Sequence, residues 1–210
     1  MRWLFLLSLS AAILSPCLAH AIPLVIEDPS FEELGSTLSD GGTGILTPST
    51  TPWSGDAKTT GLFNPAAGEF TLEVPDGDIV AFSSGGAITQ QLSDLVEANT
   101  RYTLRARVGA RASGLFEGAT VELLAGESAV RGTSLASVMA GEFAEVVVEY
   151  VTGGSDAAIG LALGIRLRGD GPIAHFDALR LDATPLPEPV SALLVALGAT
   201  LLAAGRSARS

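Results

Sequence analysis

The residues of this sequence best suited to chemistry are two carboxylates, Glu32 and Asp177. Asp177 lies in a predicted strand over residues 175–181, where alternation places it on the same face as Leu179 and Leu181. If the leucines face the core, the carboxylate lies at the rim of that core and needs a partner. Two carboxylates with backbone carbonyl oxygens would form the hard oxygen site that Ca²⁺ prefers. Alternatively, Asp177 accepts backbone N–H groups or pairs with an arginine, while Glu32 is solvated.

The sequence gives little support for catalysis, and we assign no catalytic residue from it. After removal of a predicted signal peptide the chain has one histidine, His175, and no cysteine, which excludes Cys/His catalysis and multi-histidine metal sites. His175 begins a predicted strand, which favours a rim or surface position over the role of a base. Ser30, Ser83 and Ser84 lack the context of a nucleophile elbow. No carboxylate pair has a local glycosidase signature.

Carbohydrate binding would require exposed aromatic side chains. The candidates are Trp53 and Phe63, which lie in a stretch over residues 35–65 that is rich in Gly, Ser, Thr and Pro, with Phe116 as a third. That composition predicts a long surface loop. An exposed Trp53 beside a groove would favour a ligand-binding role for Trp53 and Phe63, whereas a tryptophan tucked under the loop would not.

The start of the chain has the three parts of a secretory signal peptide over residues 1–21. A basic residue, Arg2, precedes an apolar run over residues 4–14, and Ala19-His20-Ala21 forms an A-x-A cleavage site. We therefore expect the mature protein to begin at Ile22. The only cysteine leaves with this peptide, so the exported domain must be stabilised without disulfides.

The remaining composition describes one acidic domain. Residues 22–186 are enough for a single domain with a substantial core. They contain 9 Lys and Arg against 22 Asp and Glu, a net charge of −13. Such a charge repels nucleic acid and anionic lipid, so we expect no nucleic-acid partner.

The last 26 residues, 185–210, predict a membrane-sorting tail. Residues 190–205 are uncharged and apolar, and at roughly 1.5 Å per residue they span about 24 Å as a helix, against a hydrocarbon core of about 30 Å. This predicts a single, short transmembrane helix, with a buried core helix or a plain anchor as the alternative. Arg206 and Arg209 beyond it would stay on the cytoplasmic side, which places the preceding domain on the opposite side of the membrane.

The tail also resembles a known sorting signal. Pro187-Glu188-Pro189, then the apolar helix, then Arg206 and Arg209 follow the order of the PEP-CTERM signal of Gram-negative bacteria. The resemblance implies an exosortase-type membrane protease as partner and cleavage near the Pro-Glu-Pro motif. It also implies export across the inner membrane, transient anchoring there by the helix, and then a location at the cell surface or outside the cell.

Between these ends, residues 22–184 predict one all-β domain, since no long apolar period of 3.6 residues occurs. The clearest strand is 101–109, where apolar residues alternate with three arginines that we expect to pair with acidic residues of a neighbouring strand. Pro75-Asp76-Gly77-Asp78 predicts a hairpin turn between strands 70–74 and 79–82. Further strands are predicted over 24–26, 87–92, 120–125, 143–151, 159–167 and 175–181. Their number and spacing favour an antiparallel jelly-roll β-sandwich.

Several segments resemble the galactose-binding-like sandwich domains shared by carbohydrate-binding modules and calcium-dependent HpiC1-like cyclases. These segments are 28–32, 99–104, 108–109, 116–118, 121–126 and 176–181. In the resembled fold the first and last strands are neighbours, which implies that Glu32 lies beside Asp177 and that the two hold a structural Ca²⁺.

Three functions follow as hypotheses. The favoured one is a non-enzymatic exported protein of the cell surface or extracellular matrix that acts through its sandwich domain, with exopolysaccharide as a partner. The second is a carbohydrate-binding module acting on exopolysaccharide. The third is a calcium-dependent enzyme of the cyclase type, which would show a deep apolar pocket holding a paired carboxylate of raised pKa.

Overall fold

The computed structural model describes residues 20–186. The predicted signal peptide, the Pro187-Glu188-Pro189 motif, the predicted helix 190–205 and the arginines Arg206 and Arg209 lie outside the described residues, apart from the end of the cleavage site. Within residues 20–186 no helix is long and apolar enough to cross a membrane.

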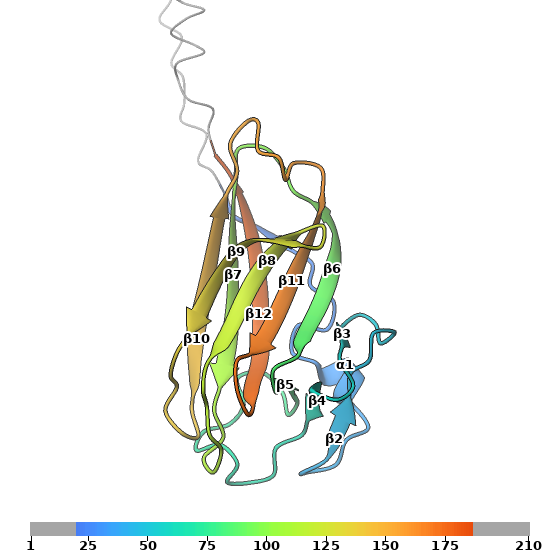
Figure 1. The fold of residues 1–210 in the computed structure, drawn as a ribbon, viewed down its shortest axis with the longest axis vertical. Coiled ribbons are helices and arrows are strands. Elements are labelled where there is room, and N and C mark those ends of the chain that lie inside the picture. Colours follow the sequence, from blue (N-terminus) through green and yellow to red (C-terminus); the bar gives the residue numbers. More distant parts are fainter. Residues whose placement is uncertain (1–19, 187–210) are drawn as a thin grey trace, which may run out of the picture.

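Two antiparallel sheets face each other and form a sandwich (Figure 1). The seven-stranded sheet contains β1 (Ile22–Leu24), β2 (Thr43–Ile45), β4 (Thr60–Phe63), β5 (Val80–Ser83), β7 (Thr100–Gly109), β10 (Phe143–Val151) and β12 (Ala174–Pro185). The five-stranded sheet contains β3 (Ser54–Gly55), β6 (Ala87–Leu95), β8 (Ala119–Ala125), β9 (Ser128–Leu135) and β11 (Ala162–Gly169). The described helix is the single turn α1 (Glu32–Gly35). The prediction of an all-β antiparallel sandwich is confirmed.

Strand order places the first and last strands side by side, because β1 pairs with β12. The larger sheet runs β10-β7-β12-β5-β4-β2, and the smaller runs β3-β6-β11-β8-β9. Alternation along β7 turns Leu104 and Val108 into the core between the sheets, where they join Leu123, Ile165 and Leu167 of the smaller sheet. The same alternation turns the arginines of β7 to the opposite face, which we call the outer face of the seven-stranded sheet.

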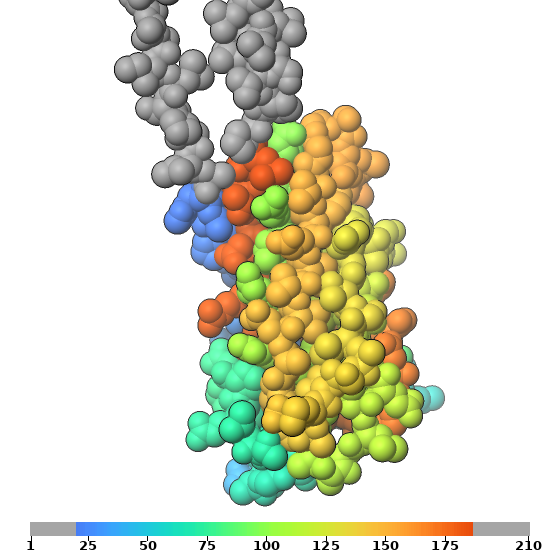
Figure 2. Space-filling model, turned by 90° about the vertical axis from the view of Figure 1, so that its left-hand side faces the viewer, coloured from blue at the N-terminus to red at the C-terminus, as the bar shows by residue number. Residues whose placement is uncertain are grey.

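Residues 64–79 cover the lower end of this outer face, and we call them the covering loop. The predicted strand over residues 70–74 is absent, because this segment makes no ladder and instead lays its apolar side chains on the sheet. Phe70 is buried in a second, small apolar cluster with Phe63 and Val80, and Phe143 of β10 packs against it at a ring distance of 4.7 Å. Figure 2 shows this teal-green segment at the lower end of the domain, next to the golden β10.

The predicted strand 159–167 is shorter than its alternating pattern indicates. β11 starts only at Ala162. Gly160 has a φ of 83°, which is outside the extended region, so the strand begins after this residue. Ile159 and Leu161 precede the strand and remain exposed, whereas Leu163 and the later apolar residues of the pattern are buried.

Candidate binding site

A β-bulge in β12 decides where Asp177 lies. Asp177 pairs with Arg107 of β7, but the next paired residue of β12 is Arg180, which lies opposite Arg105. Ala178, inside this bulge, has a φ of 49°, in the left-handed region. The extra residue reverses the alternation, so that Leu179 faces the core while Asp177 points to the outer face with Arg107. The expectation that Asp177 shares a face with Leu179 and Leu181 is therefore wrong.

The covering loop closes over the Asp177 carboxylate. Its Oδ2 atom accepts the backbone N–H of Asp76 at 2.9 Å, and its Oδ1 atom accepts that of Ala178 at 2.6 Å. The side chain is fully buried. Burial raises the pKa of Asp177 to about 7, and the nearby charges of Asp76 and Glu32 add to this effect against the two hydrogen bonds. The carboxyl is thus held by backbone N–H groups, which is the alternative considered from the sequence.

Glu32 binds the same turn from the other end. The Oε1 atom of Glu32 accepts the backbone N–H groups of Asp78 at 2.9 Å and of Ile79 at 2.7 Å. Together with the bond from Asp76 to Asp177, this fastens residues 75–79 between α1 and β12. The structure therefore brings Glu32 and Asp177 to one turn, and Asp76, expected to belong to a simple hairpin turn, takes part in the same arrangement.

The calcium prediction meets a shortage of ligands here. Ca²⁺ takes about six to eight oxygen ligands. Among residues 20–186 no group of three or more Asp, Glu, His or Cys side chains is placed to hold a metal ion. The carboxylates of Glu32 and Asp177 accept backbone N–H groups. Calcium binding at these two residues stays a prediction.

The aromatic residues proposed for sugar binding are in the interior. Trp53 is fully buried, its Nε1–H donates to the carbonyl oxygen of Asp28 at 2.9 Å, and its ring lies 5.1 Å from that of Phe31. Phe63 is buried beneath the Arg111 guanidinium, 3.8 Å from the ring centroid. A role for Trp53 and Phe63 as an exposed sugar platform is therefore wrong. Burying the indole gains apolar contact while its N–H keeps a partner.

His175 is also buried rather than at the rim. It lies on β12 under the covering loop, edge-on to Phe70 at a ring distance of 5.3 Å. Burial, with a smaller effect from Arg111, lowers the pKa of His175 to about 3. The imidazole is neutral at physiological pH and almost completely buried.

An open pocket of about 380 Å³ lies on the outer face, between the covering loop and β7, β10 and β12. Leu72 and Glu73 of the loop form one wall, while Phe143 and charged residues of the three strands form the rest. The charged residues of the strands are Arg105, Arg107, Glu145 and Arg180. The sequence showed the arginines of β7, but Arg180 joins them only through strand pairing.

One carboxylate of the sheet, Glu145, pairs with two of the three arginines of this pocket. Glu145 accepts from Arg105 at 3.1 Å and lies 4.0 Å from Arg107, which bears out the expected pairing with a neighbouring strand for these two residues. Within residues 20–186, Arg180 has no acidic side chain within 4 Å. The strands thus contribute three positive charges and one negative charge to the pocket, although the domain as a whole is acidic.

Fold and site define an antiparallel β-sandwich domain with a charged pocket on one outer face. The family model named HpiC1-like, and described as HpiC1 cyclase, matches residues 22–182, so the chain belongs to this family. None of the curated proteins compared with the chain matches it.

Solved structures agree on the fold. The cyclase Fisc from Fischerella sp. TAU, in complex with (3Z)-3-(1-methyl-2-pyrrolidinylidene)-3H-indole, is 23% identical with a TM-score of 0.70, covering 80% of this chain and all of that one. The tandem CBM22-1-CBM22-2 domain of Paenibacillus barcinonensis Xyn10C is 14% identical with a TM-score of 0.50, covering 83% of this chain and 48% of that one. At these identities the likeness shows the fold alone.

Proposed function

We propose that this chain is an exported, exosortase-processed protein of the cell surface or extracellular matrix whose sandwich domain binds exopolysaccharide without transforming it. The proposed organisation is a signal peptide over 1–21, the sandwich over 22–184 and a sorting tail over 185–210. The observation that supports binding over catalysis is the contrast between the open pocket and the closed carboxylate. The pocket of about 380 Å³ presents charged and apolar side chains to solvent, whereas Asp177 is fully buried.

The pocket has the properties of a small-ligand site. Its volume falls in the range of about 300–1,000 Å³ that is usual for such sites. Glu73 and Glu145 can accept hydrogen bonds from hydroxyl groups, the arginines can donate, and Phe143 and Leu72 offer apolar surface for the carbon faces of a sugar ring. The covering loop forms one wall of the pocket and three neighbouring strands form the rest, so the site is already present without a ligand.

Sedimentation with insoluble exopolysaccharide from the producing cells tests the binding function. The protein should move to the pellet in a saturable way and be released by soluble fragments of the same polymer. Protein that stays in the supernatant at every polymer concentration would contradict the proposal.

Intact-mass measurement tests the export route separately. Protein recovered from the culture fluid should begin at Ile22 and end near Pro187, since the A-x-A site and the sorting motif lie there. Extracellular protein that keeps residues 190–205 would refute processing by an exosortase-type protease, and it would leave the binding experiment unaffected.

A second candidate function is calcium-dependent catalysis of the cyclase type. It is favoured by the family and by Asp177, because a pKa raised to about 7 keeps a fraction of the carboxyl protonated at neutral pH, as a general acid requires. In this structure a substrate could reach Asp177 only after the covering loop had moved. A ligand found in a related Fischerella cyclase, 4-(1H-indol-3-yl)butan-2-one, is a suitable probe. Saturable binding of this probe that is lost in Asp177→Asn would favour the enzyme, and the absence of binding would favour the binding module.

A further inference from the structure

We propose that the outer-face pocket recognises the carboxylate of an acidic sugar, so that the ligand is a uronate-containing polysaccharide. Arg105, Arg107 and Arg180 are the residues that would bind the carboxylate. This inference rests on the proposed binding function and specifies its ligand class.

The first observation is the direct pairing of two like charges. Arg105 of β7 and Arg180 of β12 are opposite each other in the ladder, with both side chains exposed on the outer face. Like charges at directly opposed positions destabilise a sheet. Arg107 lies two residues from Arg105 on the same face and adds a third positive charge. An anion bound among these guanidinium groups would remove the repulsion.

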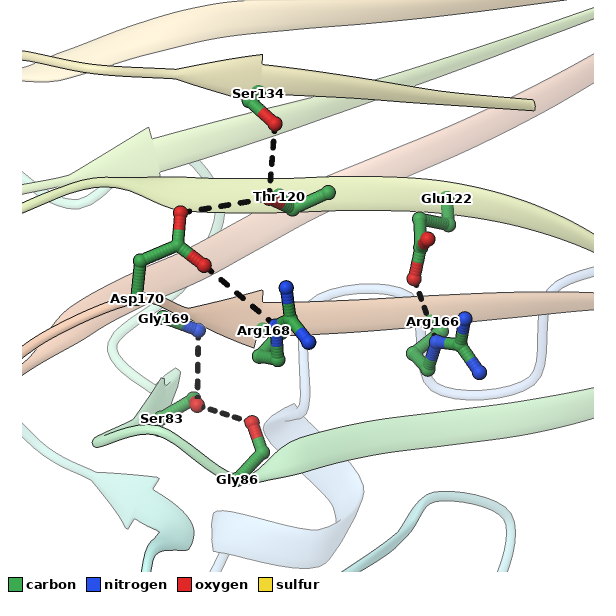
Figure 3. Close-up of polar contacts among 9 residues, drawn as sticks. All are labelled: Ser83, Gly86, Thr120, Glu122, Ser134, Arg166, Arg168, Gly169 and Asp170. Carbon is green, nitrogen blue, oxygen red and sulfur yellow. Dashed lines mark hydrogen bonds and ion pairs between the residues drawn. The ribbon is translucent and has the colours of Figure 1, made fainter. Parts of the chain in front are cut away.

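The second observation is the arrangement of arginines on the other sheet, which shows a different pattern. Figure 3 shows Arg166 and Arg168 of β11, each beside its own carboxylate. Arg166 contacts Glu122 at 2.6 Å, and Arg168 lies 3.5 Å from Asp170. On the outer face of the seven-stranded sheet, Arg105 and Arg107 share Glu145, and Arg180 has no ion pair among the residues that the structure describes. The pocket thus gathers three arginines with one carboxylate of the sheet, whereas Arg166 and Arg168 each have a carboxylate of their own.

The shape and charge of the site favour a carboxylated sugar. Guanidinium groups match the planar carboxylate with two parallel hydrogen bonds. A concave site of about 380 Å³ accepts a ring-sized group better than a flat protein surface does. The net charge of −13 over residues 22–186 opposes general attraction of polyanions. Binding must therefore come from contacts inside the pocket, within the screening length of about 8–10 Å in physiological salt.

Binding measurements with defined polymers test the inference. The purified full-length chain is titrated with oligogalacturonate, with a neutral oligosaccharide of equal length and with dextran sulfate. We expect oligogalacturonate to bind, the neutral sugar to bind at least tenfold more weakly, and the sulfated polymer not to compete at equal charge. Arg180→Gln and Arg105→Gln should each weaken oligogalacturonate binding about tenfold, equivalent to about 1.4 kcal/mol.

The matched control is Arg131→Gln on β9 of the other sheet, which removes one exposed positive charge that does not line the pocket. It should bind oligogalacturonate like the unmodified protein. Equal losses in Arg131→Gln and Arg180→Gln, or unchanged binding in Arg105→Gln and Arg180→Gln, would overturn the inference. Preference for the neutral sugar would overturn it while leaving the proposed polysaccharide-binding function in place, and preference for dextran sulfate would overturn the carboxylate assignment.

Discussion

Replacing Asp177 by Asn should change how the stability of the domain depends on pH. The carboxyl is fully buried and its pKa is raised from 3.8 to about 7 in the folded state. Between these two pH values the folded protein binds a proton that the unfolded chain does not. The free energy of unfolding of the unmodified protein therefore falls as pH rises from about 4 to about 7, and the contribution of the protonated carboxyl is lost above that window.

The size of the effect follows from the same values. One pKa unit corresponds to about 1.4 kcal/mol, so a rise in the pKa of Asp177 from 3.8 to about 7 changes the free energy of unfolding by about 4 kcal/mol. Asn cannot ionise, but its amide group can accept only one of the two N–H groups that reach Asp177. Leaving the other N–H unpaired costs about 1–3 kcal/mol at every pH. The variant should thus be less stable at pH 4 and equally or more stable at pH 8.

Urea unfolding followed by circular dichroism, from pH 4 to pH 8.5 in chelator, measures this difference. Asp182→Asn is the control, since Asp182 lies on the same strand and its variant should track the unmodified protein. A constant difference between Asp177→Asn and the unmodified protein at all pH values would refute the reasoning. Repeating the series in millimolar calcium tests the predicted ion, because calcium bound to Asp177 would keep it ionised and raise stability at pH 8.

Three further predictions concern the interior. Trp53→Ala should lower the free energy of unfolding by about 3–5 kcal/mol in urea titrations, because it removes a buried indole and its bond to Asp28. His175 has a pKa lowered to about 3, so the stability it contributes is complete above about pH 6.5 and is lost as pH falls towards 3. His175→Phe should reduce this acid sensitivity in thermal unfolding between pH 3 and 7. Phe70→Ala should loosen the covering loop, and limited proteolysis should then cut first within residues 64–79.

The sheet framework could be predicted from the sequence because alternation reports burial directly. In β7 every second residue from Tyr102 to Val108 faces the core, as the period of two indicates. The covering loop could not be predicted, since Phe70 and Val74 alternate like strand residues but pack on the outer face of a sheet formed by distant strands. An apolar pattern indicates that side chains are buried without showing which face of which sheet buries them.

The position of the candidate site could not be predicted, because it depends on the bulge residue Ala178, which an alternating pattern does not reveal. A strict period of two places Asp177 with the leucines of β12, at the edge of the core. The bulge at Ala178, with its φ of 49°, moves Asp177 to the outer face and at the same time leaves Arg180 exposed opposite Arg105. Asp177 and Arg180 are three residues apart, so without the bulge they would lie on opposite faces and one of the two would face the core, where a charged side chain is costly. The same irregularity therefore creates both the closed carboxylate and the open cationic pocket, so the two features belong to one structural element even though only the pocket is open to a ligand.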